Sequence, residues 1–266
     1  MGVRGILRNI FGKSDTRPVN TPVPEEPEVE IQDSSEPTDA TLQIMGMEIS
    51  EEAAEAVRAA IKKSGVWFVD IPRTSSSSIR TELGRHFGPA YGKSNLFEQD
   101  EALEQLFLDH VPAHVMRSFL GEEVWDSVFT FSVVRNPWDR CFSLFNYLQR
   151  SENIPMEWSF AQFLHALEKA DENTPGFKFH GHRYGASDFL LDKDNTVLVD
   201  QIVRFEDRDQ GLAKVAERLN LPELGKLHLQ RATERGANYR DQYDSESRRI
   251  VGRLYEKDIK LFGYEF

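Results

Sequence analysis

The sequence has a single cysteine, fewer basic than acidic residues and no long apolar run. Each of these shortages argues against a class of protein. Cys141 alone cannot build a disulfide framework or a cysteine-based metal cluster, and it fits a reducing compartment. No apolar run approaches the roughly 18 residues that span a bilayer, and residues 1–13 lack the continuous apolar core of a secretory signal. The net charge of −12 disfavours general nucleic-acid binding but permits a local basic pocket. We therefore expect a cytoplasmic protein that does not bind nucleic acid.

Residues 1–40 differ in composition from the rest of the chain. In residues 1–13, apolar side chains recur at helical spacing with basic residues outside that stripe. This pattern predicts a short amphipathic helix that contacts a membrane or a protein partner, and a frayed terminus is the alternative because so short a helix is marginal in water. Residues 14–40 are rich in proline and acids, which predicts a disordered tether. A single folded domain is expected over residues 41–266.

Within this domain, short apolar strands alternate with helical patterns. The strands are predicted at residues 66–71, 128–134 and 197–204. The principal helices are predicted at residues 51–63, 137–150, 207–219 and 245–262. This alternation favours an α/β fold with a largely parallel sheet. Ligands of such sheets bind beyond the carboxyl ends of the strands.

The first strand leads through "PRTSSSS" into an amphipathic helix, which is an arrangement suited to an anion. Backbone N–H groups at the start of a helix have no partner within it, and the helix dipole adds partial positive charge. Arg73 supplies a fixed charge, and the hydroxyl groups that follow supply further donors. The segment lacks the Walker A pattern, G-x-x-x-x-G-K-S/T. Taken alone, a serine-rich connecting turn explains it equally well.

The second strand end has a similar design, in the segment "FTFSVVRNPWDRCFSLF". Asn136 is suited to cap a helix whose first residue is Pro137. Arg135 at the strand end and Ser143 on the helix are candidates to bind one anion together. The alternative is that Arg135 forms a structural ion pair with Asp139.

Together these segments resemble motifs of the sulfotransferases. "FVDIPRTSSSSIR" is similar to their 5′-phosphosulfate loop, F-V-H-I-P-K-T-G-G-T-S. "VVRNPWDRCFSLF" is similar to their 3′-phosphate element, R-N/D-P-x-D/E-R-x-x-S, with the same arginine-to-serine spacing. Residues 199–221 and 239–266 resemble later blocks of the membrane-associated, carbohydrate-type sulfotransferases and their bacterial relatives. The resemblance covers residues 66–266.

The resemblance implies a P-loop-like, three-layer fold with a central, largely parallel sheet, and 3′-phosphoadenosine 5′-phosphosulfate (PAPS) as the cofactor. By motif position, Arg73 replaces the usual lysine at the phosphosulfate, while Arg135 and Ser143 hold the 3′-phosphate that distinguishes PAPS from ATP-like nucleotides. The residues implied to cradle the phosphosulfate are Thr74, Ser75, Ser76, Ser77 and Ser78. Candidates for a late loop that covers the nucleotide are Arg231, Arg235, Tyr239 and Arg240, although a solvated basic loop explains them as well.

The sequence departs from the family pattern at two places. Ser75 and Ser76 stand where glycines are usual, so any positive φ in this loop is unfavourable. Arg73 places a planar fork where a lysine places a compact charge, and the two are not interchangeable at a tight site. Both departures suggest either slow chemistry or a protein that binds the nucleotide without turning it over.

Sulfuryl transfer requires in-line positioning, stabilisation of charge on the leaving oxygen and a base for the acceptor hydroxyl. A histidine that titrates near neutrality is suited to act as the base. His110 matches the first position of the H-x-x-A segment in which the family carries such a histidine, and His114 is the alternative. His180 and His182 lack a third ligand at suitable spacing, so we expect no metal.

The sequence therefore predicts a PAPS-dependent sulfotransferase that acts on a hydroxyl of a sugar or glycoconjugate, with Arg73 and His110 as its catalytic residues. The alternative is a regulatory protein that binds PAPS or its product, 3′-phosphoadenosine 5′-phosphate (PAP), without efficient turnover. An ATP-dependent kinase is disfavoured by the missing Walker pattern and by the pairing of Arg135 with Ser143.

Overall fold

The computed structural model describes residues 42–44, 47–49, 51–87, 110–170, 183–222, 224 and 238–266. The predictions for residues 1–40 lie outside these ranges, as do those for Arg231, Arg235, His180 and His182. Among the described helices, none has both the length and the apolar character needed to cross a bilayer.

A parallel sheet lies at the centre of the described structure. Its strands, in spatial order, are β3 (Val66–Val69), β4 (Phe129–Val134) and β5 (Gln201–Arg204). Phe68 is paired with Phe131 across the first interface, and their rings lie 4.9 Å apart. The predicted strands at 66–71 and 197–204 are confirmed in position but are shorter. A separate antiparallel hairpin is formed by β1 (Leu42–Ile44) and β2 (Met47–Ile49).

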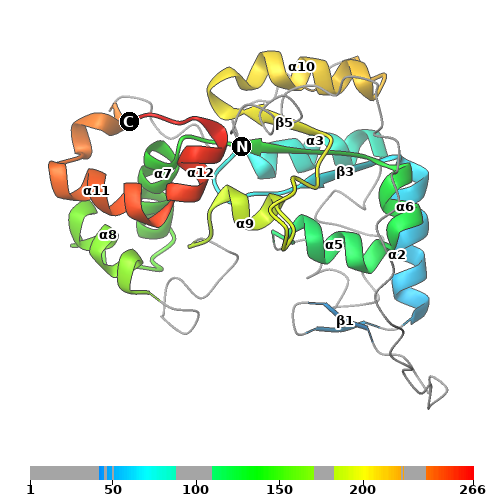
Figure 1. Ribbon diagram of the computed structural model, residues 1–266, viewed down its shortest axis with the longest axis horizontal. Helices are drawn as coiled ribbons and strands as arrows, with labels where there is room; N and C mark the ends of the chain where they lie inside the picture. The colour runs from blue at the N-terminus through cyan, green and yellow to red at the C-terminus, as the bar shows by residue number, and fades with distance from the viewer. Residues whose placement is uncertain are drawn as a thin grey trace, which may run out of the picture.

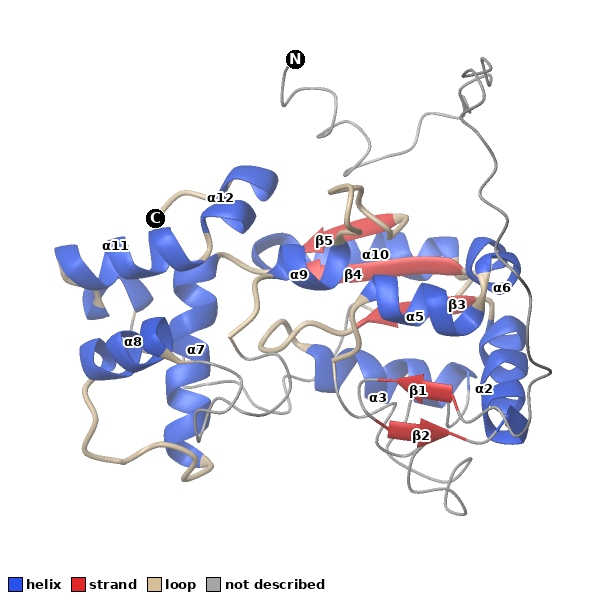
Figure 2. Ribbon diagram, turned by 60° about the horizontal axis from the view of Figure 1, so that its bottom comes forward, coloured by secondary structure: helices blue, strands red, loops and turns tan. Residues whose placement is uncertain are grey.

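Helices cover both faces of the sheet, which explains why its strands are apolar on both sides. Helix α10 (Arg208–Arg218) lies on one face, while α5 (Ala113–Leu120) and α9 (Ala186–Leu190) lie on the other (Figures 1 and 2). Helices α2 (Glu51–Ser64) and α6 (Glu122–Ser127) lie where β3 and β4 begin. The structure is therefore a mixed α/β fold with a small parallel sheet.

A second group of helices lies beyond the carboxyl ends of the strands (Figure 1). It consists of α7 (Pro137–Arg150), α8 (Phe160–Lys169), α11 (Ser245–Leu254) and α12 (Glu256–Phe262). The predicted helix at 137–150 is confirmed, and Asn136 caps it by accepting a hydrogen bond from the backbone N–H of Trp138 at 3.1 Å.

The prediction of one continuous helix over residues 245–262 is wrong, because the backbone leaves the helical region at Tyr255 (φ −120°, ψ 30°). The break separates α11 from α12. Beyond it, the buried carboxylate of Asp258 accepts hydrogen bonds from the backbone N–H groups of Ala186 (2.6 Å) and Ser187 (2.8 Å). The last helix is thereby held against the start of α9.

Candidate functional site

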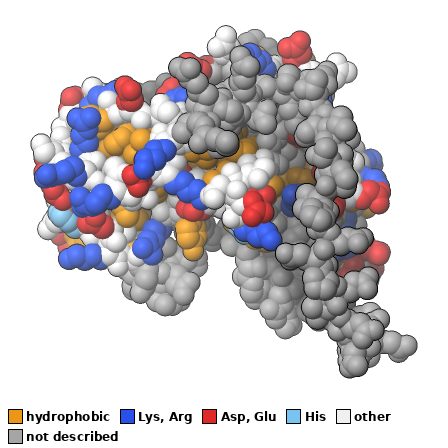
Figure 3. Space-filling model, viewed as in Figure 1, with side chains coloured by type: hydrophobic (Ala, Val, Ile, Leu, Met, Phe, Trp, Pro, Cys, Tyr) orange, Lys and Arg blue, Asp and Glu red, His pale blue; other side chains and the backbone are white. Residues whose placement is uncertain are grey.

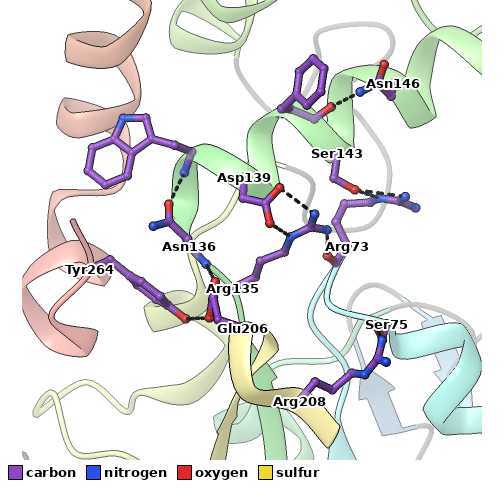
Figure 4. Close-up of polar contacts among 12 residues, drawn as sticks. Arg73, Ser75, Arg135, Asn136, Asp139, Ser143, Asn146, Glu206, Arg208 and Tyr264 are labelled. Atoms are coloured by element: carbon purple, nitrogen blue, oxygen red, sulfur yellow. Dashed lines mark hydrogen bonds and ion pairs between the residues drawn. The ribbon is translucent and has the colours of Figure 1, made fainter. Parts of the chain in front are cut away.

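Three arginines converge at the carboxyl ends of the three parallel strands. Arg73 lies in the loop after β3, Arg135 follows β4 directly, and Arg208 is the first residue of α10, after β5 and the short 3-10 helix η1 (Phe205–Asp207). Parallel strands end at the same edge of a sheet, so these residues approach one another although they are far apart in sequence. In Figure 4, the Arg73 and Arg135 side chains point to Ser143 and Asp139 on α7, and the Arg208 side chain points to Ser75, just before α3 (Ser76–Phe87).

The loop before α3 contains strained backbone. Arg73 has φ 69° and Ser75 has φ 75°, in the left-handed region that favours glycine, whereas Ser76 is the first residue of the helix. The Ser75 carbonyl accepts hydrogen bonds from the backbone N–H groups of Ser78 and Ile79, both at 3.1 Å. Thr74, fully buried, donates its hydroxyl proton to the Ile71 carbonyl at 2.8 Å. These contacts fix the start of α3, and the first N–H groups of a helix have no partner from the preceding turn of that helix.

The Arg73 side chain extends from this loop toward α7. Its Nε and Nη2 atoms each lie 3.3 Å from the hydroxyl oxygen of Ser143, and its guanidinium lies 4.6 Å from the centre of the Tyr147 ring. Ser143 is buried. The structure therefore brings Ser143 into contact with Arg73, whereas the sequence paired it with Arg135.

Arg135 forms the ion pair that the sequence left as an alternative. Its Nε and Nη2 atoms donate to the two carboxylate oxygens of Asp139 at 2.7 and 2.8 Å, and Nη1 donates to the Arg73 carbonyl at 3.0 Å. The guanidinium also stacks on the Phe205 ring at 4.1 Å. A bidentate arginine–carboxylate pair has a defined geometry. Asp139 therefore fixes the direction of the Arg135 side chain at the strand ends.

The chain segment 262–266 supports the same strand ends. Glu206 accepts hydrogen bonds from the Asn136 backbone N–H at 2.7 Å and from the Tyr264 hydroxyl at 3.2 Å, and the Asn136 amide donates to the Glu265 carbonyl at 2.8 Å. Arg204 donates to the Phe262 carbonyl at 2.8 Å. Burial, followed by the nearby Glu206 carboxylate, raises the pKa of Tyr264, so its hydroxyl stays a donor. Within the described residues, Glu206 thus anchors structure.

His110 lies beside the strand-end loop and contacts Asp70. Its Nδ1 atom is 3.1 Å from the Asp70 carbonyl oxygen, its hydrogen-bond acceptor, and 3.1 Å from the Asp70 carboxylate. Arg80 contacts the other carboxylate oxygen at 3.1 Å. Burial opposes the charge on His110, but the Asp70 carboxylate and hydrogen bonds to Asp70 outweigh it and raise the pKa of His110. Burial also opposes the charge on Asp70, yet His110 and then Arg80 lower the pKa of Asp70.

The other predicted residues lie farther from these contacts. His114 is exposed on α5. Arg240, in the 3-10 helix η2 (Tyr239–Gln242), is exposed, and its guanidinium lies 4.8 Å from the Tyr239 ring. Burial raises the pKa of Tyr239. Directly after η2, the Tyr243 hydroxyl donates to the Trp138 carbonyl at 2.8 Å, so this segment lies near the start of α7.

Two residues of the site were not found from the sequence. Arg208 donates to the Ser75 hydroxyl at 3.2 Å, and Asp70 is the charged partner of His110. Arg208 stands at the start of a helix that follows the third strand, as Arg73 and Arg135 follow the first and second strands. This shared position could have identified it as a site residue from the sequence. Among the described residues, no group of three histidine, cysteine, aspartate or glutamate side chains is placed to hold a metal ion.

Comparison with known proteins agrees with this geometry. The sulfotransferase family matches residues 51–265, so the chain belongs to the sulfotransferase family. Membership indicates transfer of a sulfuryl group to an acceptor that carries a hydroxyl. An uncharacterized protein of Archaeoglobus fulgidus is 28% identical over 131 residues, which cover 49% of this chain and 98% of that protein. No solved structure matches the chain.

Proposed function

We propose that this protein transfers a sulfuryl group from PAPS to an acceptor hydroxyl at the carboxyl ends of β3, β4 and β5. The gathering of Arg73, Arg135 and Arg208 around the loop that leads into α3 carries this proposal. A helix N-terminus surrounded by guanidinium groups favours a ligand with several negative charges. PAPS carries such charges at the 3′ and 5′ positions of its ribose. We also propose that the fold is the P-loop-like, three-layer fold of the family.

The two strand-end elements would hold different parts of the nucleotide. Arg73, with the backbone N–H groups of residues 75–77 and the hydroxyls of residues 75–78, would bind the 5′-phosphosulfate. Thr74 would hold the loop in place through its hydrogen bond to the Ile71 carbonyl. Arg135 and Ser143 would bind the 3′-phosphate. The contact of Arg73 with Ser143 at 3.3 Å supports this division, because it places the two elements side by side. Arg240 would cover the nucleotide from η2.

Bound PAPS would supply a sulfuryl group whose leaving group is the 5′-phosphate. In the proposed transfer, the acceptor oxygen would form a bond to sulfur as the bond between sulfur and the bridging oxygen breaks, and the electron pair of the broken bond would remain on the 5′-phosphate. Arg73 and the N–H groups at the start of α3 would stabilise the charge on that oxygen. His110 would take the hydroxyl proton. Its Nδ1 atom donates to the Asp70 carbonyl, so Nε2 would be the acceptor.

We propose a sugar or glycoconjugate as the acceptor, following the carbohydrate-type sulfotransferases that the sequence resembles. On the face shown in Figure 3, basic side chains lie among acidic ones over the group of α8 and α11. Arg253, for example, pairs with Glu168 at 2.8 Å and with Glu246 at 3.4 Å. Together with the net charge of −12, this mixture favours an acceptor that is not itself a polyanion.

The remaining proposals concern the setting of the enzyme. We propose that it acts in the cytoplasm, that residues 41–266 form its one domain, and that residues 14–40 are a tether. Residues 1–13 would contact a membrane or a protein partner.

The second candidate function is binding of PAP or PAPS without efficient turnover. The positive φ values of Arg73 and Ser75 favour it, since these side chains occupy strained backbone at the position of the phosphosulfate. Such strain costs of order 1–3 kcal/mol for each residue. Turnover of labelled PAPS distinguishes an enzyme from a binding protein.

Calorimetric titration with PAP and with ATP tests the cofactor. The wild type is expected to bind PAP more tightly than ATP, and Arg135→Ala is expected to lose this preference. Arg150→Ala, at the exposed far end of the same helix, is the matched control. An intact wild type that does not bind PAP would refute the proposed function.

A further inference from the structure

Arg208 is a buried cation whose charge is only partly compensated. Its side chain is 9% exposed, and its Nε and Nη2 atoms contact one carboxylate oxygen of Asp209 at 3.1 and 2.8 Å. The Asp209 side chain is 73% exposed, so water screens its charge. A buried charge is unfavourable unless it is well paired. Arg208 therefore retains positive charge that a further anion would neutralise.

The rest of the guanidinium is directed at the strained loop. Nη1 of Arg208 donates to the Ser75 hydroxyl at 3.2 Å, and Ser75 is the residue with φ 75° that precedes the first turn of α3. The Phe205 ring lies 5.8 Å from the guanidinium. The cation is thus held beside the end of α3 at which the helix dipole is positive.

Arg73 extends in a different direction from the same loop. Its guanidinium contacts Ser143 of α7 at 3.3 Å (Figure 4). It also lies over the ring of Tyr147, on the same helix. At Ser75 itself, the guanidinium in contact is that of Arg208. The Arg73 side chain therefore leaves the loop toward α7, whereas the Arg208 side chain reaches the loop from α10.

We propose that Arg208 is a second binding residue for the 5′-phosphosulfate, acting together with the hydroxyl of Ser75. This inference rests on the proposed function. Arg208 contacts the Ser75 end of the loop, while Arg73 lies between this end and the 3′-phosphate element. A serine at position 75 thereby gains a role that a glycine does not have, since its hydroxyl joins the loop to α10.

Ligands that carry only one phosphate test this assignment. We would titrate the wild type and Arg208→Ala with PAP, adenosine 5′-monophosphate and adenosine 3′-monophosphate. Loss of one hydrogen bond to a charged group corresponds to a roughly 10- to 100-fold loss of affinity. Arg208→Ala is expected to lose this much for PAP and the 5′-monophosphate and to bind the 3′-monophosphate as the wild type does. Arg135→Ala is expected to lose affinity for PAP and the 3′-monophosphate and to bind the 5′-monophosphate as the wild type does.

The controls separate this inference from the proposed function. Arg218→Ala removes an exposed arginine at the other end of α10 and is expected to leave all three affinities unchanged. If Arg208→Ala does not fold, Arg208→Lys and Ser75→Gly report on the same contact, and each is expected to weaken binding of the 5′-monophosphate selectively. Equal loss for all ligands, or no loss, would overturn the role of Arg208. Failure of the wild type to bind PAP would instead overturn the proposed function.

Discussion

Replacement of Asp70 by asparagine should destabilise the protein in a manner that depends on pH. The Asp70 carboxylate lies 3.1 Å from both Arg80 and His110 and is 7% exposed. Two opposite charges at this separation attract by about 5 kcal/mol at an effective dielectric constant of about 20. Burial offsets part of this attraction, and breaking a buried pair typically costs about 3–5 kcal/mol. Because asparagine preserves the volume and one oxygen acceptor, we expect a loss of about 3 kcal/mol.

The sign of the pH dependence follows from the two pKa shifts. The pKa of Asp70 is below its ordinary value of 3.8, so its contribution to stability is complete above that value and is lost as the pH falls through the folded-state pKa. The pKa of His110 is above its ordinary value of 6.5, so its contribution is complete below 6.5 and is lost as the pH rises through the folded-state pKa. The effect of the substitution is therefore largest between 3.8 and 6.5.

Urea unfolding followed by tryptophan fluorescence measures this difference. We would compare the wild type and Asp70→Asn from about pH 4 to about pH 9, with the exposed Asp126→Asn on α6 as a control expected to differ little at any pH. The difference in free energy of unfolding between the two proteins should decrease at alkaline pH, where His110 is neutral and only the ion pair of Asp70 with Arg80 remains. A difference that is the same at the two ends of the range would show that His110 is not a charged partner of Asp70.

Three further predictions test His110 as the catalytic base, the packing of α10 against the sheet and the burial of the Cys141 thiol. His110→Ala should lower kcat by about 10²- to 10⁴-fold, and kcat/KM of the wild type should rise with pH above 6.5 because the pKa of His110 is raised. An unaffected rate would favour His114. Gly211→Ala places a Cβ atom 2.4 Å from the Val203 side chain. We expect a net loss of about 1 kcal/mol in urea unfolding that disappears in a Val203→Ala background. Burial raises the pKa of Cys141 to about 11, so a thiol reagent at neutral pH should label it only after unfolding, and fast labelling of the native protein would contradict its burial.

Local pattern was sufficient to predict most of the sheet and the helices around it. Short apolar runs marked β3, β4 and β5, and Asn136 with Pro137 fixed the start of α7, because capping and proline geometry act over a few residues. The continuous helix over 245–262 was wrong for the opposite reason. Its amphipathic stripe continues through Tyr255, but the backbone leaves the helical region there and Asp258, beyond the break, contacts the distant start of α9.

The candidate site was predictable in its position but not in its pairings. The order of the strands places residues 73, 135 and 143 at one edge of the sheet, and the motifs indicated this. The contacts of Arg73 with Ser143 and of Arg208 with Ser75 join residues far apart in the chain. Such contacts depend on how β5 and α10 pack against the loop, which no local spacing encodes. The positive φ of Ser75 is equally a result of that packing, because serine does not favour it.

The hydrogen bonds of residues 262–266 impose an order on how the site is completed when the chain is synthesised. Asn136, Glu206 and Arg204 gain their partners in this segment only after the last of these residues has been made. Until then, the turns that follow β4 and β5 lack part of their support, while β3, β4 and most of the core already exist. The sheet can therefore assemble before residues 262–266 support the carboxyl ends of its strands. A ribosome-bound chain that ends before Phe262 is expected to contain the sheet without the full set of hydrogen bonds at its strand ends.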